Sequence, residues 1–299
     1  MTRFRNGWLA VMVLTVTGLS FGQAGAKVDP AYQMSIEKWR AEMLEDLKEN
    51  WLPLAGLFWL KPGENTFGSA PSNALVLPEN SAPAKGGSFL LQGREVTVRF
   101  ASGASATING KFAASAKLDS DRTGHPTEIS LGTLRMYVIE RGERVGIRVK
   151  DLDSPAVKNF RGQEFYPLSL RYRVTAKWVP SDGKKTVDVP NVLGDIAPTP
   201  VAGEAHFAIN GKELTLEALG GDAAQGLFFI FKDPTSKTET YPAGRFLQTD
   251  AVSNGTVVLD FNQAYNPPCA VTPYATCPLP PKENQLTVAI PAGEKYVKH

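Results

Sequence analysis

Leu134-Arg-Met-Tyr-Val-Ile-Glu-Arg-Gly-Glu-Arg-Val-Gly-Ile-Arg-Val-Lys150 decides the fold class. The stretch predicts two antiparallel strands around a short glycine-containing turn. In the second strand Val145, Ile147 and Val149 alternate with arginine, glycine and lysine. Side chains on a strand point to opposite faces in turn, so this period of two indicates one buried and one polar face. The stretch therefore predicts a β-hairpin packed on a core.

The same alternation recurs on both sides of this hairpin. Two Asn-Gly pairs, at 109–110 and 210–211, supply the positive φ that a type I′ hairpin turn requires. Further strands are predicted at 88–92, 95–100, 171–179, 205–209, 212–218, 227–231, 256–261 and 285–290. A dozen or more short, mostly antiparallel strands, separated by Gly, Asn or Pro turns, indicate an all-β barrel or sandwich.

One helix is predicted, near the N-terminus. Asp29 can cap it and Pro30 suits its first position. Apolar residues then recur at helical spacing, at Tyr32, Ile36, Trp39, Met43 and Leu47. We expect an amphipathic helix within residues 27–50, packed on the β-sheets.

Residues 51–299 are long enough for one large β domain. The alternative is two β halves, divided near residues 182–201, because that stretch is rich in proline and shows no clear period. A single continuous domain is the interpretation favoured by the sequence.

The first 26 residues are typical of a signal peptide. Arg3 and Arg5 precede an apolar run at 8–19, and Ala24-Gly25-Ala26 is a small-residue cleavage pattern. The apolar run is too short for a membrane-spanning helix. We therefore expect an exported protein, periplasmic or extracellular, with no membrane span after cleavage.

Charge excludes one class of partner. Removal of residues 1–26 takes away two arginines and no acidic residue, which leaves 30 basic and 30 acidic residues. A neutral chain offers no electrostatic attraction for nucleic acid, so no nucleic-acid partner is expected.

The late stretch 240–294 carries both cysteines and a dense set of prolines. Proline fixes φ and removes a backbone donor, so this segment is a rigid irregular loop. Cys269 and Cys277 are predicted to form a disulfide, as an even pair in an exported protein does. Two reduced thiols, or half of a metal site, are the alternatives.

A rigid loop of this kind can hold polar side chains in a fixed array. With the end of the 144–150 strand, it yields these candidate ligand-binding residues: Arg148, Asp151, Tyr166, Tyr241, Arg245, Asn262, Tyr265, Asn266, Glu283 and Asn284. The alternative is structural: Arg245 pairs with Asp260 or Glu283, and the asparagines bind loop backbone.

Other motifs carry no chemistry. Gly18-Leu19-Ser20-Phe21-Gly22 matches the nucleophile-elbow pattern but lies inside the expected signal peptide. No histidines stand at metal-ligand spacing, and the calcium-like run 119–124 has Ser130 where a calcium loop needs glutamate. No metal site and no cofactor are therefore expected.

The blocks 240–247, 260–262, 265–269, 277–281 and 283–284 resemble the C-terminal signature of a bacterial and archaeal family known only as a domain of unknown function. Residues 51–63, 148–151 and 160–166 also resemble its pattern, so the resemblance extends over roughly 35–295. It implies no activity. It does imply that the late loop matters.

Three functions are compatible with these patterns. The first is binding of a small polar or carboxylate-bearing ligand in a pocket lined by the proline-rich loop. The second is a hydrolase of unfamiliar type with paired carboxylates drawn from Asp151, Asp260, Glu283 or Glu294. The third is a ligand-free structural or interaction module of the cell envelope. The sequence leaves open whether the protein is an enzyme.

Overall fold

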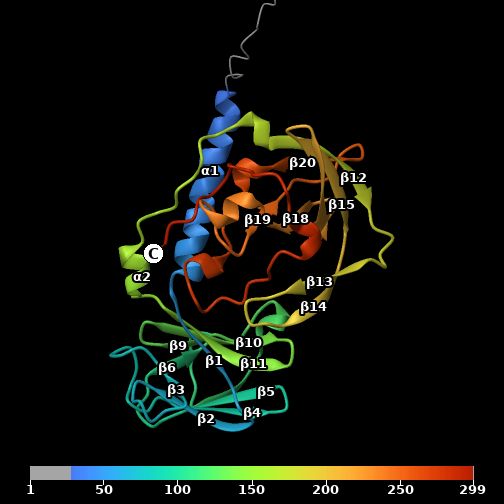
Figure 1. The fold of residues 1–299 in the computed structure, drawn as a ribbon. Coiled ribbons are helices and arrows are strands. Elements are labelled where there is room, and N and C mark those ends of the chain that lie inside the picture. The colour runs from blue at the N-terminus through green and yellow to red at the C-terminus, as the bar shows by residue number, and fades with distance from the viewer. Residues whose placement is uncertain (1–27, 299) are drawn as a thin grey trace, which may run out of the picture.

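The computed structural model describes residues 28–298. The expected signal peptide, residues 1–26, lies outside the described residues. The described chain is mainly β, with twenty strands in several sheets, one long N-terminal helix and several short helical turns. The sheets form two lobes, one above the other in Figure 1. The all-β prediction is confirmed, and of the two alternatives the open, sandwich-like arrangement is the one found.

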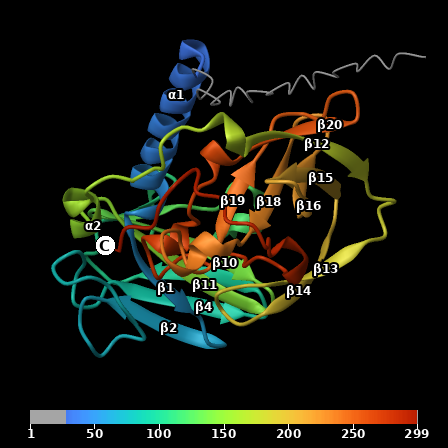
Figure 2. The ribbon, with the colours of Figure 1, turned by 45° about the horizontal axis from the view of Figure 1, so that its top comes forward.

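The long helix, α1, spans Pro30–Asp46 and runs into a π-helical turn, η1, at Leu47–Trp51. Asp29 caps it, since its carboxylate accepts a hydrogen bond from the Ala31 N–H at 2.9 Å, and Pro30 begins it. The five apolar residues at helical spacing form its covered face: Ile36 is buried and the other four are half-buried. The helix lies along the C-terminal lobe, which is the upper lobe in Figure 1 (Figures 1 and 2).

The N-terminal lobe, residues 54–151, holds two sheets packed face to face. One has the order β1-β11-β10-β9-β6-β7 and the other β3-β2-β4-β5-β8. The strands are β1 Leu54–Trp59, β2 Gly63–Gly68, β3 Leu75–Val76, β4 Gly87–Gln92, β5 Glu95–Phe100, β6 Ala106–Ile108, β7 Lys111–Phe112, β8 Ser115–Leu118, β9 Ile129–Leu131, β10 Leu134–Arg141 and β11 Arg144–Asp151.

The predicted hairpin is β10–β11, in which Val138 pairs with Ile147 and Met136 with Val149. These residues are buried between the two sheets. On the opposite face of β11, Arg144 and Arg148 contact Asp195 and Tyr274 of the C-terminal half, and Lys150 contacts Asn50 of η1.

The C-terminal lobe contains sheets of order β16-β15-β12-β20 and β17-β18-β19, and the hairpin β13-β14. Its strands are β12 Arg173–Pro180, β13 Thr186–Pro190, β14 Ile196–Pro200, β15 Gly203–Ile209, β16 Lys212–Ala218, β17 Gly220–Asp222, β18 Gly226–Phe231, β19 Arg245–Gln248 and β20 Thr256–Asp260. Asn210 and Gly211 join β15 to β16 with φ of 56° and 74°, the positive values expected for a type I′ turn.

Short helical turns connect the strands of both lobes. They are η2 Asp121–Thr123, α2 Pro155–Asn159, η3 Leu170–Tyr172, η4 Pro234–Lys237, η5 Phe261–Gln263, η6 Pro268–Ala270 and η7 Lys282–Asn284. The most important for the site is α2, which lies in the connection between the two lobes.

One local prediction is corrected. Residues 285–290 form no strand; they make one isolated bridge, and the Ile290 N–H binds the Asp233 carboxylate at 2.7 Å instead of a neighbouring strand. The stretch 182–201 contains the paired strands β13 and β14, and the strands on either side of it, β12 and β15, pair in one sheet. The change from one group of sheets to the other falls between β11 and β12, near α2.

The proline-rich loop, residues 264–281, lies between the lobes. Arg141 of β10 donates to the Thr276 hydroxyl at 3.0 Å, and Trp51 packs on the apolar cluster that contains Cys277. On the other side Val192 binds the Cys277 carbonyl at 3.1 Å. The loop thus joins the N-terminal sandwich to the β13–β14 hairpin.

Candidate functional site

Arg245, on β19, is fully buried in the C-terminal lobe. Its guanidinium donates to Asp233 and to the Ile290 carbonyl, each at 3.0 Å, and also to the Ala292 carbonyl. The ring of Phe231 lies 5.0 Å from it. Burial lowers the pKa of Arg245, and the Asp233 carboxylate opposes that shift. Arg245 therefore fastens the C-terminal segment to the sheet. Its ion-pair partner is Asp233, whereas the structural alternative from the sequence was Asp260 or Glu283.

Asp260 and Asn262 hold α1 and a neighbouring loop. Asp260 accepts a hydrogen bond from the Tyr32 hydroxyl at 2.8 Å and lies 3.4 Å from Arg173. Asn262 binds both the N–H and the carbonyl of Ser169, each at 3.0 Å. Both side chains are buried. Their partners are groups of this chain, so they support the fold at the junction with the helix.

Asn284 and Glu283 share the turn η7 but differ in environment. Asn284 is fully buried and binds the backbone N–H and carbonyl of Glu217 and the carbonyl of Ile230. Glu283 is half-buried and lines a shallow cleft beside β13 and β14. Asn284 therefore has a structural role. Glu283 faces solvent, and its carboxylate lies 3.8 Å from the Lys282 ammonium.

The three tyrosines bind neighbouring segments. Tyr166 donates to Glu239 at 2.8 Å, and Tyr241 donates to the Cys269 carbonyl at 3.0 Å. Tyr265 packs edge-on against the rings of Trp39 and Phe246. Burial raises the pKa of Tyr265 to about 12, so the phenol stays neutral at physiological pH.

Arg148 and Asp151 come from β11. Arg148 is buried between the lobes, where its guanidinium reaches the Tyr274 carbonyl at 3.5 Å and, within residues 28–298, forms no ion pair. Asp151 turns the chain at the end of the strand, since its carboxylate accepts from the Asp153 N–H at 3.0 Å. Neither lines the cleft described below.

The structure contains a disulfide between Cys269 and Cys277, with Cα atoms 6.2 Å apart. Closing a loop this short stabilises a fold by about 2–3 kcal/mol in the chain-entropy model. The disulfide fixes the part of the proline-rich loop that faces β10 and β11.

The candidate carboxylates are not paired. In the described part of the chain, Asp151, Asp260, Glu283 and Glu294 have no hydrogen-bond partner in common. A hydrolase with paired carboxylates needs two of them in one cleft. The geometry offers no support for that mechanism.

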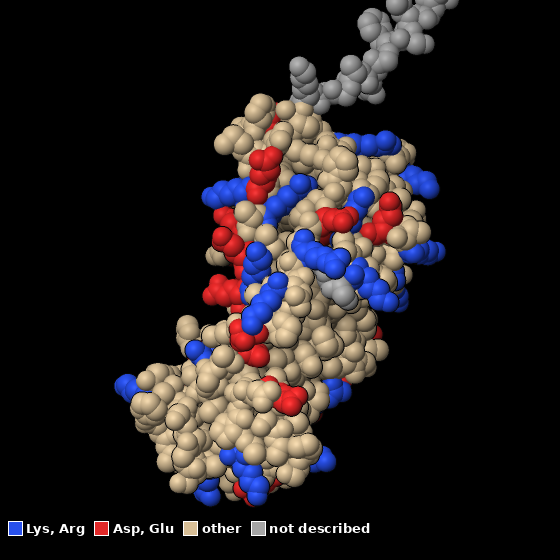
Figure 3. Space-filling view, turned by 90° about the vertical axis from the view of Figure 1, so that its left-hand side faces the viewer, with Lys and Arg blue, Asp and Glu red and all other residues tan. Residues whose placement is uncertain are grey.

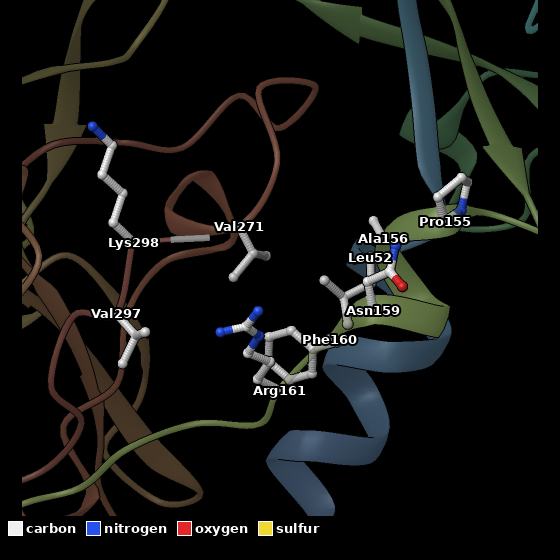
Figure 4. Close-up of a pocket in the computed structure, with 9 residues that line it drawn as sticks. All are labelled: Leu52, Pro155, Ala156, Asn159, Phe160, Arg161, Val271, Val297 and Lys298. Atoms are coloured by element: carbon white, nitrogen blue, oxygen red, sulfur yellow. The ribbon is translucent and has the colours of Figure 1, made fainter.

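A cleft of about 570 Å³ opens where α2, the segment after it, the proline-rich loop and the C-terminal tail meet. We call it the α2 cleft. Its lining is Leu52, Pro155, Ala156, Asn159, Phe160, Arg161, Val271, Val297 and Lys298 (Figure 4). Most of these side chains are apolar, two are cationic and none is acidic.

Two charged residues line the α2 cleft, Arg161 and Lys298, and both are exposed. The Arg161 guanidinium points toward Val271 beside the ring of Phe160, whereas Lys298 extends away (Figure 4). Figure 3 views the molecule from the side of α2 and the C-terminal end, and shows Lys and Arg gathered in the middle of the C-terminal lobe. Acidic side chains lie along its left-hand edge and also among these basic ones.

Sequence reasoning missed the residues of this cleft. Asn159, Arg161 and Lys298 stand in no motif, and Arg161 lies within the 160–166 block that was noted only for its resemblance. A signal for α2 was present, because Ser154-Pro155 repeats the cap-and-proline pattern of Asp29-Pro30. Ser154 indeed accepts from the Ala156 N–H at 3.2 Å.

Two further observations concern residues 28–298. No group of three or more His, Cys, Asp or Glu side chains in this range is arranged to hold a metal ion. None of the helices formed by these residues has the length and apolarity that crossing a membrane requires.

Fold and cleft together define a two-lobed all-β protein, with a helix along one lobe and an apolar, cation-bearing cleft at the lobe junction. The chain belongs to the family described as "Protein of unknown function (DUF1684)", which matches residues 158–295. That range includes the late stretch, Arg161 and Glu294. No curated protein matches the chain.

Three solved structures are similar to parts of the chain. A solution NMR structure of an uncharacterized protein from Haloarcula marismortui is 30% identical and covers 46% of this chain and 78% of its own, with a TM-score of 0.38. Two FHA-domain structures, one studied for phosphothreonine-dependent interactions and one from FhaA in complex with an intracellular domain, are each 15% identical. They cover 31% of this chain and 92% and 97% of their own, each with a TM-score of 0.23. TM-scores this low support no argument about a common fold.

Proposed function

We propose that this protein binds a small amphipathic molecule with a carboxylate group, in the α2 cleft. The observation that carries the proposal is the Arg161 guanidinium, which points into a cleft with apolar walls and no acidic lining residue. The cation that we propose for the ligand carboxylate is thus Arg161. The sequence pointed to Arg148 and Arg245, but both are buried against protein groups.

The size and chemistry of the cleft support this ligand class. Ligand pockets commonly have volumes of about 300–1,000 Å³, and this cleft has about 570 Å³. Leu52, Phe160, Val271 and Val297 can cover an alkyl or aryl body, which favours binding through burial of apolar surface. A guanidinium forks onto a carboxylate through two hydrogen bonds, which fixes the orientation of the charged end.

Replacement of Arg161 by glutamine tests the proposal. We expect the affinity for octanoate, measured by isothermal titration calorimetry, to fall about ten- to hundredfold, because one charge-assisted contact contributes about 1.5–3 kcal/mol. Octanol, which shares the chain but lacks the charge, should bind the wild type and Arg161→Gln equally weakly.

Arg122→Gln is the matched control, since Arg122 is an exposed arginine on the N-terminal lobe, far along the chain from the cleft. It should bind octanoate as the wild type does. Equal octanoate affinity in Arg161→Gln and wild type would contradict the proposal.

A specific observation also favours a second candidate, a structural or interaction module of the cell envelope. Arg245, Tyr241 and Asn266 of the late stretch bind protein groups, and the disulfide loop joins the lobes. In that case no small molecule would raise the unfolding temperature of the protein.

Export to the periplasm or the cell exterior is part of the proposal. It rests on the N-terminal pattern of residues 1–26 and on a disulfide typical of oxidising compartments. Mass spectrometry of protein from the native host is expected to show a mature chain that begins at Lys27. A full-length chain in the soluble cell interior would contradict export.

A further inference from the structure

The carboxyl group of Glu294 lies where the three segments around the α2 cleft meet. It is 6% exposed. Its Oε2 accepts a hydrogen bond from the Asn266 N–H at 2.8 Å, and the Gln163 side chain also binds it. Gln163 follows the cleft residues Phe160 and Arg161, Asn266 precedes the disulfide, and Glu294 begins the C-terminal tail. One buried group therefore connects all three walls.

A small cavity places this carboxyl directly behind the cleft. The cavity, of about 10 Å³, is lined by Glu294, Asn266 and Gln163, among others. It shares Phe160, Val271 and Val297 with the α2 cleft. The cavity that holds Glu294 and the α2 cleft are therefore neighbours with these three side chains in common.

Within residues 28–298, Glu294 has no ion-pair partner, because the nearby cations are engaged elsewhere. Arg245 acts on it through space but is itself bound to Asp233. The Lys295 ammonium lies over the Tyr166 ring at 4.9 Å, and the side chain of Glu164 is exposed. Burial raises the pKa of Glu294 to about 7, from a usual value of 4.5.

We propose that binding of an anion in the α2 cleft is coupled to the uptake of one proton by Glu294, an inference that depends on the proposed carboxylate site. When Glu294 is ionised, its negative charge repels the negatively charged carboxylate of the ligand. Because the protein between them is poorly solvated, this repulsion is only weakly screened. The proton comes from solvent and converts the carboxylate to a carboxyl group. By linkage, the bound anion in turn favours the protonated form of Glu294.

Calorimetry with octanoate at about pH 6 and about pH 8.5 tests the coupling, because the ligand carboxylate is ionised at both values. The wild type should bind about five- to tenfold more weakly at the higher pH, the low end of typical coupling between sites. Near pH 7, titrations in buffers of different ionisation enthalpy should show net proton uptake on binding. This measurement needs no variant.

Glu294→Gln should bind octanoate with one affinity at both pH values, close to the wild-type value at about pH 6. Glu213→Gln, at an exposed glutamate of β16 that lines neither cavity, is the control and should keep the wild-type pH dependence. Binding by the wild type without pH dependence or proton uptake overturns the coupling and leaves the cleft standing. Pronounced pH dependence in Glu294→Gln also overturns it. No octanoate binding at either pH removes the proposed function, and the coupling with it.

Discussion

Replacing Arg245 by methionine is expected to lower the free energy of unfolding by about 3–5 kcal/mol. Arg245 and Asp233 are both fully shielded from solvent, with Nη2 and Oδ1 3.0 Å apart. Removing the cation leaves the Asp233 carboxylate buried without its counter-charge. The same change also leaves the Ile290 and Ala292 carbonyls without their donors.

The loss should be visible in urea unfolding followed by tryptophan fluorescence, to which Trp178 in the core of the C-terminal lobe contributes. Arg245→Lys keeps the charge but cannot reproduce three hydrogen bonds from one planar fork, so an intermediate loss is expected. Arg171→Met, at an exposed arginine of the same lobe, should change the unfolding free energy by less than about 0.5 kcal/mol. A similarly small loss in Arg245→Met would show that the buried pair does not hold the tail in place.

Glu294→Gln is expected to raise the free energy of unfolding at pH 8 by about 3 kcal/mol, and to have little effect near pH 4.5. The pKa of Glu294 is about 7 in the folded protein and about 4.5 when exposed. Between these values the folded state binds the proton and the unfolded state does not. The contribution of this group is therefore fully present below pH 4.5 and is lost as the pH rises through 7.

Chemical unfolding of both proteins from pH 4.5 to pH 8 measures this effect. Glutamine retains a side-chain oxygen that can accept the Asn266 N–H but carries no charge, so the difference between the proteins should grow with pH. Glu213→Gln, on an exposed side chain of β16, should follow the wild-type curve. A constant difference between Glu294→Gln and wild type would mean that Glu294 does not change its protonation in this range.

The local patterns that predicted the fold are those in which neighbouring residues set the backbone. The β10–β11 hairpin, the Asn210-Gly211 turn and the cap at Asp29 were confirmed because period, positive φ and capping are short-range properties. The proline-rich stretch 182–201 shows no clear period in the sequence, although it contains β13 and β14. Proline is tolerated at the edge of a small sheet, and β14 is such an edge strand.

The candidate site depended on long-range contacts that a single sequence does not display. Arg245 was named as a ligand residue from its type and its loop, but Asp233 and the 290–292 backbone surround it. Arg161 stands in no motif, and it becomes notable only when Val271 and Val297, more than a hundred residues later, complete the cleft. Side-chain chemistry was readable from the sequence, whereas the meeting of distant segments required the fold.

The path of the chain has a consequence for the order in which this protein can fold. The Tyr32 hydroxyl of α1 binds Asp260, 228 residues later, while the whole N-terminal sandwich is built from the residues between α1 and α2. During synthesis, or passage through a translocation channel, α1 emerges early and its partners Asp260 and Tyr265 emerge near the end. The sandwich can form meanwhile from contiguous chain. The C-terminal lobe is thus completed only when the final fifth of the polypeptide returns to its beginning, so a truncation before Asp260 would remove the partners of Tyr32 and Trp39 in that segment, Asp260 and Tyr265.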